Sequence, residues 1–177
     1  MTNYKPTLQE CAMRYGTGMG LLWAFKFMLF PLGLRIPFLQ LLFIVLTIGV
    51  PILGYIFAKK FRERHCEGSI TFSRAFLFTT FMYMFASIFI AVVHYIYFRY
   101  IDGGFVFEAY RSILSQFENT AGAELTASLK QFKDAIDLLS GLTPLEMTFQ
   151  LISQNMFYGI LMAIPTALIV MRKKKNQ

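Results

Sequence analysis

The stretch that decides the fold reads Pro31-Leu32-Gly33-Leu34-Arg35-Ile36-Pro37. It interrupts an apolar run over residues 15–58, which is too long for one membrane crossing because about 20 helical residues span a hydrocarbon core of about 30 Å. Pro37 disfavours helix at the residue before it, and Gly33 permits a turn. The stretch therefore predicts two helices joined by a tight hairpin.

The composition of the whole chain excludes an ordinary soluble domain. Of the 177 residues, 56% are hydrophobic and 15% are charged, whereas soluble domains are about 25% charged. We therefore expect an all-α, polytopic membrane protein that forms a single membrane domain over residues 1–177. Its four transmembrane helices are predicted at residues 15–34, 36–58, 75–101 and 144–171. The first is the weakest of the four, because Lys26 lies inside it.

The last predicted helix has a clear start signal. Thr143 supplies a capping hydroxyl, Pro144 takes the first helical position and Glu146 the third. This order is a capping box with proline at its preferred place. We therefore expect the helix to begin at Pro144.

The connection between the third and fourth spans is too long for a bare loop. Apolar residues recur at helical spacing in both of its halves, first at Phe107, Tyr110, Leu114 and Phe117, then at Leu125, Leu129, Phe132, Ile136 and Leu139. The pattern predicts a short external amphipathic segment of two helices at about residues 104–142, split near 119–122. Their stripes could pack on each other, lie on the outer bilayer surface or meet a partner.

The distribution of basic residues predicts the orientation. Residues 1–14, 59–74 and 172–177 hold eleven of the 17 lysines and arginines. The positive-inside rule therefore places both termini and the 59–74 loop in the cytoplasm. We expect eight of these side chains to contact anionic lipid, unless they are only topological anchors: Lys59, Lys60, Arg62, Arg64, Arg172, Lys173, Lys174 and Lys175. Since they cluster at span ends rather than in one stripe, nucleic-acid binding is not expected.

Polar residues inside the spans predict one intramembrane cluster. A charge near mid-bilayer is costly, so Lys26 should face protein or water. At about 1.5 Å of rise per residue, Lys26, His94, Gln154 and Asn155 reach a similar depth in the outer half of the membrane. They could line a ligand or proton path. Alternatively, Lys26 reaches toward headgroups and His94 hydrogen-bonds between helices.

Small residues one turn apart predict close helix packing. Gly16 with Gly20, and Gly159 with Ala163, form faces that let two helix backbones approach, within one chain or between copies. No catalytic residue, metal site or cofactor is predicted. Cys11 and Cys66 both fall on the predicted cytoplasmic side, so we expect reduced thiols.

Two sequence motifs resemble a known family. A basic loop runs into Gly68-Ser69-Ile70-Thr71-Phe72-Ser73-Arg74-Ala75-Phe76, and a later span ends Tyr95-Ile96-Tyr97-Phe98-Arg99-Tyr100-Ile101-Asp102. Together they resemble the bacterial membrane family catalogued as domain of unknown function 4199, over nearly the whole chain. Proline often follows the aspartate in that family, whereas Gly103 follows here. The resemblance implies four helices and a cytoplasmic-membrane location, and it supplies no activity, cofactor or catalytic residue.

Three functions are compatible with these features. We expect a non-enzymatic protein of the bacterial cell envelope, an accessory or assembly subunit, with the lipid bilayer as its first partner and a membrane protein or a second copy as another. A small oligomeric channel or transporter built around Lys26 and His94 is the alternative. A lipid-modifying enzyme is the third, with Asp102, Glu108 and Glu146 as its best-placed carboxylates.

Overall fold

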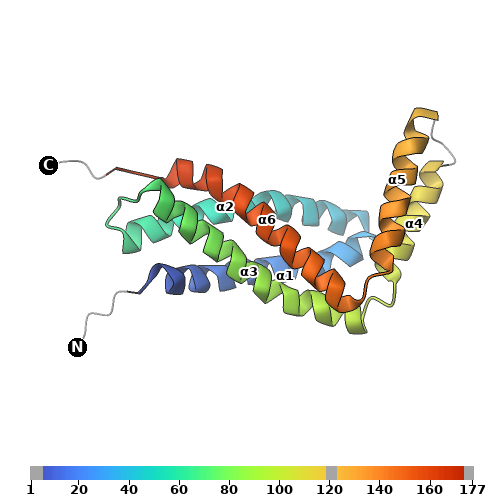
Figure 1. Cartoon of the computed structure of the whole chain (residues 1–177), viewed down its shortest axis with the longest axis horizontal. Coiled ribbons are helices and arrows are strands. Elements are labelled where there is room, and N and C mark those ends of the chain that lie inside the picture. Colours follow the sequence, from blue (N-terminus) through green and yellow to red (C-terminus); the bar gives the residue numbers. More distant parts are fainter. Residues whose placement is uncertain (1–5, 119–122, 174–177) are drawn as a thin grey trace. The chain divides into compact units, whose positions relative to one another are not determined.

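Six helices make up the computed structural model, which describes residues 6–118 and 123–173 (Figure 1). They are α1 (Leu8–Gly33), α2 (Pro37–His65), α3 (Phe72–Tyr100), α4 (Phe105–Glu118), α5 (Ala123–Ser140) and α6 (Pro144–Val170). The all-α prediction is confirmed. Within the described residues α2, α3 and α6 are long and apolar enough to cross a membrane. Because α1 does not join them, four membrane-spanning helices are not confirmed.

The chain divides into two compact units, and α3 and α6 pass from one to the other. The first, here called the bundle unit, comprises Met1–Ala91 and Leu151–Gln177. The second, the hairpin unit, comprises Val92–Gln150.

Two helix boundaries follow the sequence signals. α1 ends at Gly33 and α2 begins at Pro37, so the predicted break is confirmed. α6 begins at Pro144, where the Glu146 amide donates to Thr143 Oγ1 at 3.3 Å and the Thr143 amide donates to Glu146 Oε2 at 2.8 Å. The predicted capping box is therefore confirmed as well.

The first helix begins at Leu8, several residues before the apolar span predicted within it. Its start is a second capping box, in which the Glu10 amide donates to Thr7 Oγ1 at 3.3 Å and the Thr7 amide donates to Glu10 Oε2 at 2.7 Å. Such a cap satisfies backbone groups that the helix leaves open. The start of α1 is thus stabilised by its cap and by the buried residues Cys11 and Ala12.

Glycines bring α1 against α3 in the bundle unit. A Cβ atom at Gly16 would lie 2.7 Å from the Met82 carbonyl oxygen and 2.8 Å from Phe85 Cβ. A Cβ atom at Gly20 would lie 2.9 Å from Phe89 Cβ. All three distances are too short for a real side chain, so this face of α1 requires glycine.

A single aromatic side chain joins α3 to the other three helices of the bundle unit. Tyr83 of α3 is 1% exposed, and its ring stacks on Trp23 of α1 with centroids 5.9 Å apart. Its hydroxyl occupies the space that a Cβ at Gly54 of α2 would need. Its Cβ lies 2.6 Å from where a Cβ at Gly159 of α6 would stand. We call this set of contacts the Tyr83 junction.

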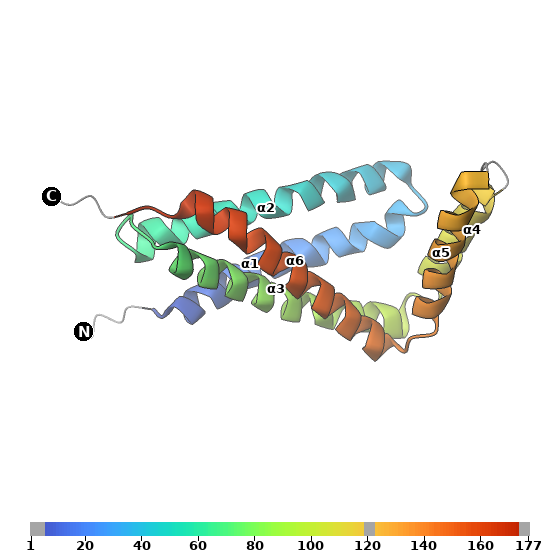
Figure 2. The ribbon, with the colours of Figure 1, turned by 45° about the horizontal axis from the view of Figure 1, so that its top comes forward.

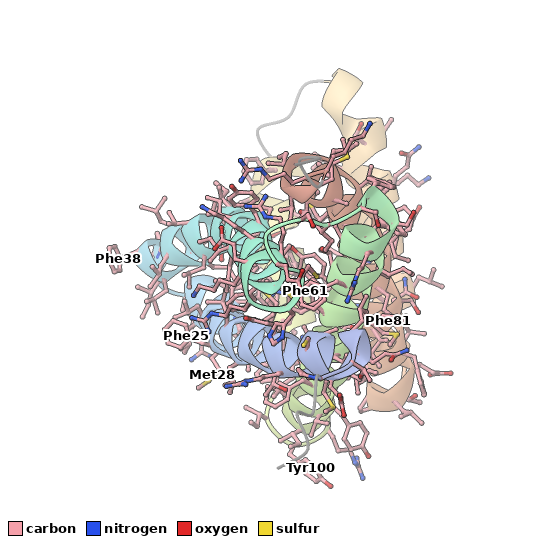
Figure 3. The ribbon with its side chains drawn as sticks, turned by 90° about the vertical axis from the view of Figure 1, so that its left-hand side faces the viewer. Phe25, Met28, Phe38, Phe61, Phe81 and Tyr100 are labelled. Atoms are coloured by element: carbon pink, nitrogen blue, oxygen red, sulfur yellow. The ribbon has the colours of Figure 1, made fainter. Side chains whose placement is uncertain are left out.

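The outward surface of the bundle unit is apolar. Phe25, Met28 and Phe38 are exposed and point away from the helices, whereas Phe61 lies inside (Figure 3). The Phe61 ring stacks on Phe78 with centroids 4.0 Å apart. Soluble monomers rarely expose so many large apolar side chains, and a lipid-facing surface does so by nature.

One end of the bundle unit gathers the start of α1, the loop between α2 and α3, and the end of α6 (Figures 1 and 2). The Ile70 amide donates to the Arg172 carbonyl at 3.0 Å, and the Arg172 amide donates back at 2.9 Å. Arg62 Nη1 also donates to the Val170 carbonyl at 3.0 Å. These bonds give carbonyl groups at and just after the C-terminal end of α6 a hydrogen-bond donor. They join this end of the chain to α2 and to the α2–α3 loop.

In the hairpin unit α4 and α5 lie side by side (Figure 2). Arg111 of α4 donates to Asp137 of α5 at 2.8 Å, and Tyr110 packs edge-on against Phe132. The apolar stripes of the two helices were predicted to pack on each other, lie on the bilayer surface or meet a partner. The first of these arrangements is present. The split at residues 119–122 and the side chain of Leu125 lie outside the described residues.

The glycine contacts predict an asymmetric response to adding one methyl group. Gly16→Ala places its Cβ against the α3 backbone, so we expect a loss of about 1–3 kcal/mol from overpacking and a lower Tm in detergent. Gly49→Ala on α2 is the matched control, because nothing lies within 4 Å of its Cβ. A Tm for Gly16→Ala equal to that of Gly49→Ala would contradict the packing of α1 on α3.

Candidate functional site

A cavity of about 260 Å³ lies among the four helices of the bundle unit. Trp23 and Lys26 of α1 line it together with residues of α2, Tyr83 of α3 and four residues of α6 that include Asn155 and Tyr158. The remaining lining is mostly apolar. We call it the bundle cavity.

Lys26 brings the only formal charge among the lining residues. Its ammonium lies over the ring of Phe43, 5.1 Å from the centroid, which is a cation–π contact. Among the described residues, no carboxylate lies within ion-pair distance of this ammonium. The cavity is therefore electropositive.

Two buried donors of the cavity wall have no hydrogen-bond partner among the described residues: Trp23 Nε1–H and the Tyr83 hydroxyl. Trp23 is 8% exposed and Tyr83 is 1% exposed. A buried polar group without a partner is costly, so native proteins rarely leave one. Trp23 lies three residues before Lys26, so both side chains lie on one face of α1.

Three of the four residues of the predicted polar cluster, Lys26, Gln154 and Asn155, lie in the bundle unit. Lys26 and Asn155 line the same cavity, whereas Gln154 is exposed and does not line it. Adjacent residues of a helix point about 100° apart, so equal depth does not give a common direction. His94 is buried but belongs to the hairpin unit. Its pairing with the other three stays a prediction.

The four predicted packing residues all lie within the bundle unit. Gly16 and Gly20 contact α3, Gly159 contacts Tyr83, and Ala163 is fully buried. Their use between two copies of the chain stays a prediction.

The predicted lipid-contacting residues fall into different environments. Lys59, Lys60 and Arg64 are exposed, whereas Arg62 is half-buried and donates to the end of α6. Lys174 and Lys175 lie outside the described residues. Arg172 and Lys173 line a second cavity, of about 400 Å³, with Arg74 and the hydroxyl-bearing residues Ser69 and Thr71. We call this second cavity the basic cradle.

The loop that forms the basic cradle needs its glycine. Gly68 has φ +77° and its amide donates to the Arg62 carbonyl at 3.1 Å, closing the C-terminus of α2. Backbone in this region is readily adopted only by glycine. The turn then presents Ser69 and Thr71 beside Arg74.

Thiol and imidazole groups lie near the same end of the bundle unit. Cys11, Arg14, Arg64 and His65 line a further cavity of about 400 Å³. Burial raises the pKa of the neighbouring Cys66 thiol, an effect that Arg74 opposes. In the described part of the chain, no group of three or more histidine, cysteine or acidic side chains could hold a metal ion.

The carboxylates considered for lipid chemistry have structural partners. Asp102 is buried and accepts from the amides of Gly104 at 3.1 Å and Val106 at 3.2 Å, which caps the start of α4. Glu146 accepts from the Thr143 amide. Glu108, in the first turn of α4, is exposed. Two of the three carboxylates thus serve helix N-termini.

The basic cradle predicts a preference for anionic lipid. Arg74→Gln combined with Arg172→Gln should weaken binding of phosphatidylglycerol about 30-fold, since each basic group near a membrane surface contributes about 1 kcal/mol. Native mass spectrometry with titrated lipid measures this. Lys130→Gln combined with Lys133→Gln on α5 removes the same charge and should change nothing. Equal losses in the two double variants would refute a local site.

Comparison with known proteins identifies the family. No curated protein and no solved structure matches the chain. The family model described as "Protein of unknown function (DUF4199)" matches residues 14–172, which include both motifs and every helix except the first turns of α1. The chain therefore belongs to the DUF4199 family.

Proposed function

We propose that this chain is a non-enzymatic protein of the bacterial inner (cytoplasmic) membrane, with four membrane-spanning helices and both termini in the cytoplasm. We further propose that it is an accessory or assembly subunit of the cell envelope. Three apolar helices already indicate a membrane protein.

The form of α1 supports a fourth span. It has 26 residues, or about 39 Å of helix, and a short turn joins it to α2. Leu21, Phe25, Met28 and Leu32 are exposed at helical spacing, while the glycine face packs on α3. Lys26 is directed into the bundle cavity. A membrane helix at the edge of a bundle exposes apolar side chains to lipid and keeps a charged side chain on the inner side, and α1 has both features.

The grouping of charges supports the orientation. Arg14, Arg64, Arg74 and Arg172 all line cavities at the end of the bundle unit where the α2–α3 loop meets the end of α6. The positive-inside rule assigns such an end to the cytoplasm. By chain connectivity, α4 and α5 then lie on the opposite side of the membrane.

The single observation that carries the accessory role is the outer surface of the hairpin unit. Phe117, Phe132 and Leu138 are 55%, 51% and 75% exposed on two amphipathic helices. Large apolar side chains on an external surface mark contact sites for proteins or membranes. An envelope protein bound there accounts for a hairpin that has its own core and is still apolar outside.

A small oligomeric channel or transporter is the second candidate, favoured by the position of Lys26 and Asn155 in one cavity. Transport needs a continuous path across the bilayer. A volume of about 260 Å³ accommodates a bound group rather than such a path. The accessory role is therefore preferred.

Cysteine labelling tests the orientation. Cys11 and Cys66 are first replaced by serine, because the raised pKa of Cys66 makes a failure to label ambiguous. In this background Ser115→Cys on α4 should react with a membrane-impermeant maleimide in intact spheroplasts. Arg64→Cys should react only after permeabilisation. Labelling of Arg64→Cys in intact spheroplasts would overturn the orientation.

Photo-crosslinking tests the accessory role. Benzoylphenylalanine at Phe132 should form a discrete adduct with one envelope protein in growing cells, identified by mass spectrometry. Lys130 provides the matched control, since it is exposed but points about 200° away around α5. Adducts with lipid alone, or the same adducts from both positions, would count against a protein partner.

A further inference from the structure

We infer that the bundle cavity binds the anionic headgroup of an amphiphile, a carboxylate or a phosphate, whose apolar chain leaves between α2 and α6. This inference rests on the four-helix placement proposed above and is independent of the accessory role. It assigns a ligand class to a cavity that the proposed function does not use.

Every polar side chain in the lining of the cavity can donate a hydrogen bond, and Lys26 and Trp23 can only donate. Lys26 supplies an ammonium, Trp23 an indole N–H, Tyr83 a phenolic O–H and Asn155 an amide. No carboxylate is among the lining residues. Donors around a fixed positive charge select a negatively charged oxygen ligand, because charge-assisted hydrogen bonds are the strongest ones available.

The two unpartnered donors are the observation that points to a bound group. Trp23 and Tyr83 both line the cavity, and the Trp23 Nε1–H and the Tyr83 hydroxyl are buried with no partner among the described residues. Each can donate to an acceptor oxygen. Trp23 lies three residues from Lys26, on the same face of α1. One anionic group can thus accept from these donors and compensate the lysine charge.

The shape of the cavity fits a headgroup with the first few carbons of a chain. Its volume of about 260 Å³ falls just below the range of about 300–1,000 Å³ for pockets that enclose drug-sized ligands. Val50 and Pro51 of α2 and Met162 of α6 add apolar lining. Thr47 and Tyr158, one on each side, are exposed on the surface that faces lipid in the proposed arrangement. An amphiphile therefore reaches the cavity sideways from the bilayer.

Fluorescence of Trp23 measures this binding directly, because it is the only tryptophan of the chain. The full chain in maltoside micelles is titrated with dibromostearate, whose bromine atoms quench indole. We expect saturable quenching by the acid and only weak, unsaturable quenching by its methyl ester. Dodecanoate or dodecyl phosphate should reverse the quenching where dodecanol does not, and whichever is stronger identifies the headgroup.

Variants make the test specific to the cavity. Lys26→Met should weaken binding at least tenfold and Lys26→Arg should largely retain it, while Lys130→Met on the exposed face of α5 should have no effect. If Lys26→Met does not fold, Asn155→Leu replaces it in the test, and we expect this variant to weaken binding several-fold. Equal quenching by acid and ester, or unchanged affinity in Lys26→Met, would overturn the inference. A failure of the four-helix placement is detected separately by the thiol labelling.

Discussion

The contact of Tyr83 with two glycines and one indole is the interaction on which the bundle unit depends. Helices in lipid gain little from burying apolar surface against each other, so their association relies on close packing. Gly54 and Gly159 leave the room that a phenol ring needs, and Trp23 stacks on the ring. One side chain of α3 thereby touches the three other helices of the unit.

The same junction creates the candidate site. A rigid ring held between two helices cannot turn to fill neighbouring space, and its hydroxyl remains beside a cavity without a partner. Lys26 lies in the wall of this cavity, so a charge, two unpartnered donors and an exposed opening between α2 and α6 come together. A ligand oxygen would accept hydrogen bonds from the groups that the packing leaves without a partner, Trp23 Nε1–H and the Tyr83 hydroxyl. Binding of such a ligand would therefore stabilise the packed bundle.

Local signals in the sequence predicted much of the fold. The break at residues 31–37 and the cap at Thr143 were found because proline, glycine and capping residues act through neighbouring backbone. The cap at Thr7, which has the same signal, was not predicted, because the start of the first helix was placed by its apolar run alone.

The candidate site was predicted in part, since the rise of a helix gives the depth of a residue but not the direction of its side chain. Lys26 and Asn155 share a cavity, whereas Gln154 does not. The role of Tyr83 depends on which faces of separate helices meet, and no local pattern contains that information.

A double-mutant cycle between Gly54→Ala and Tyr83→Leu tests the junction most directly. The added methyl group at Gly54 meets the Tyr83 hydroxyl, which leucine lacks. Thermal unfolding in detergent should show that Gly54→Ala destabilises the natural chain but has little effect in the Tyr83→Leu background, with a coupling of about 0.5–3 kcal/mol. An equal loss of stability in both backgrounds would show that Tyr83 does not occupy the space at Gly54.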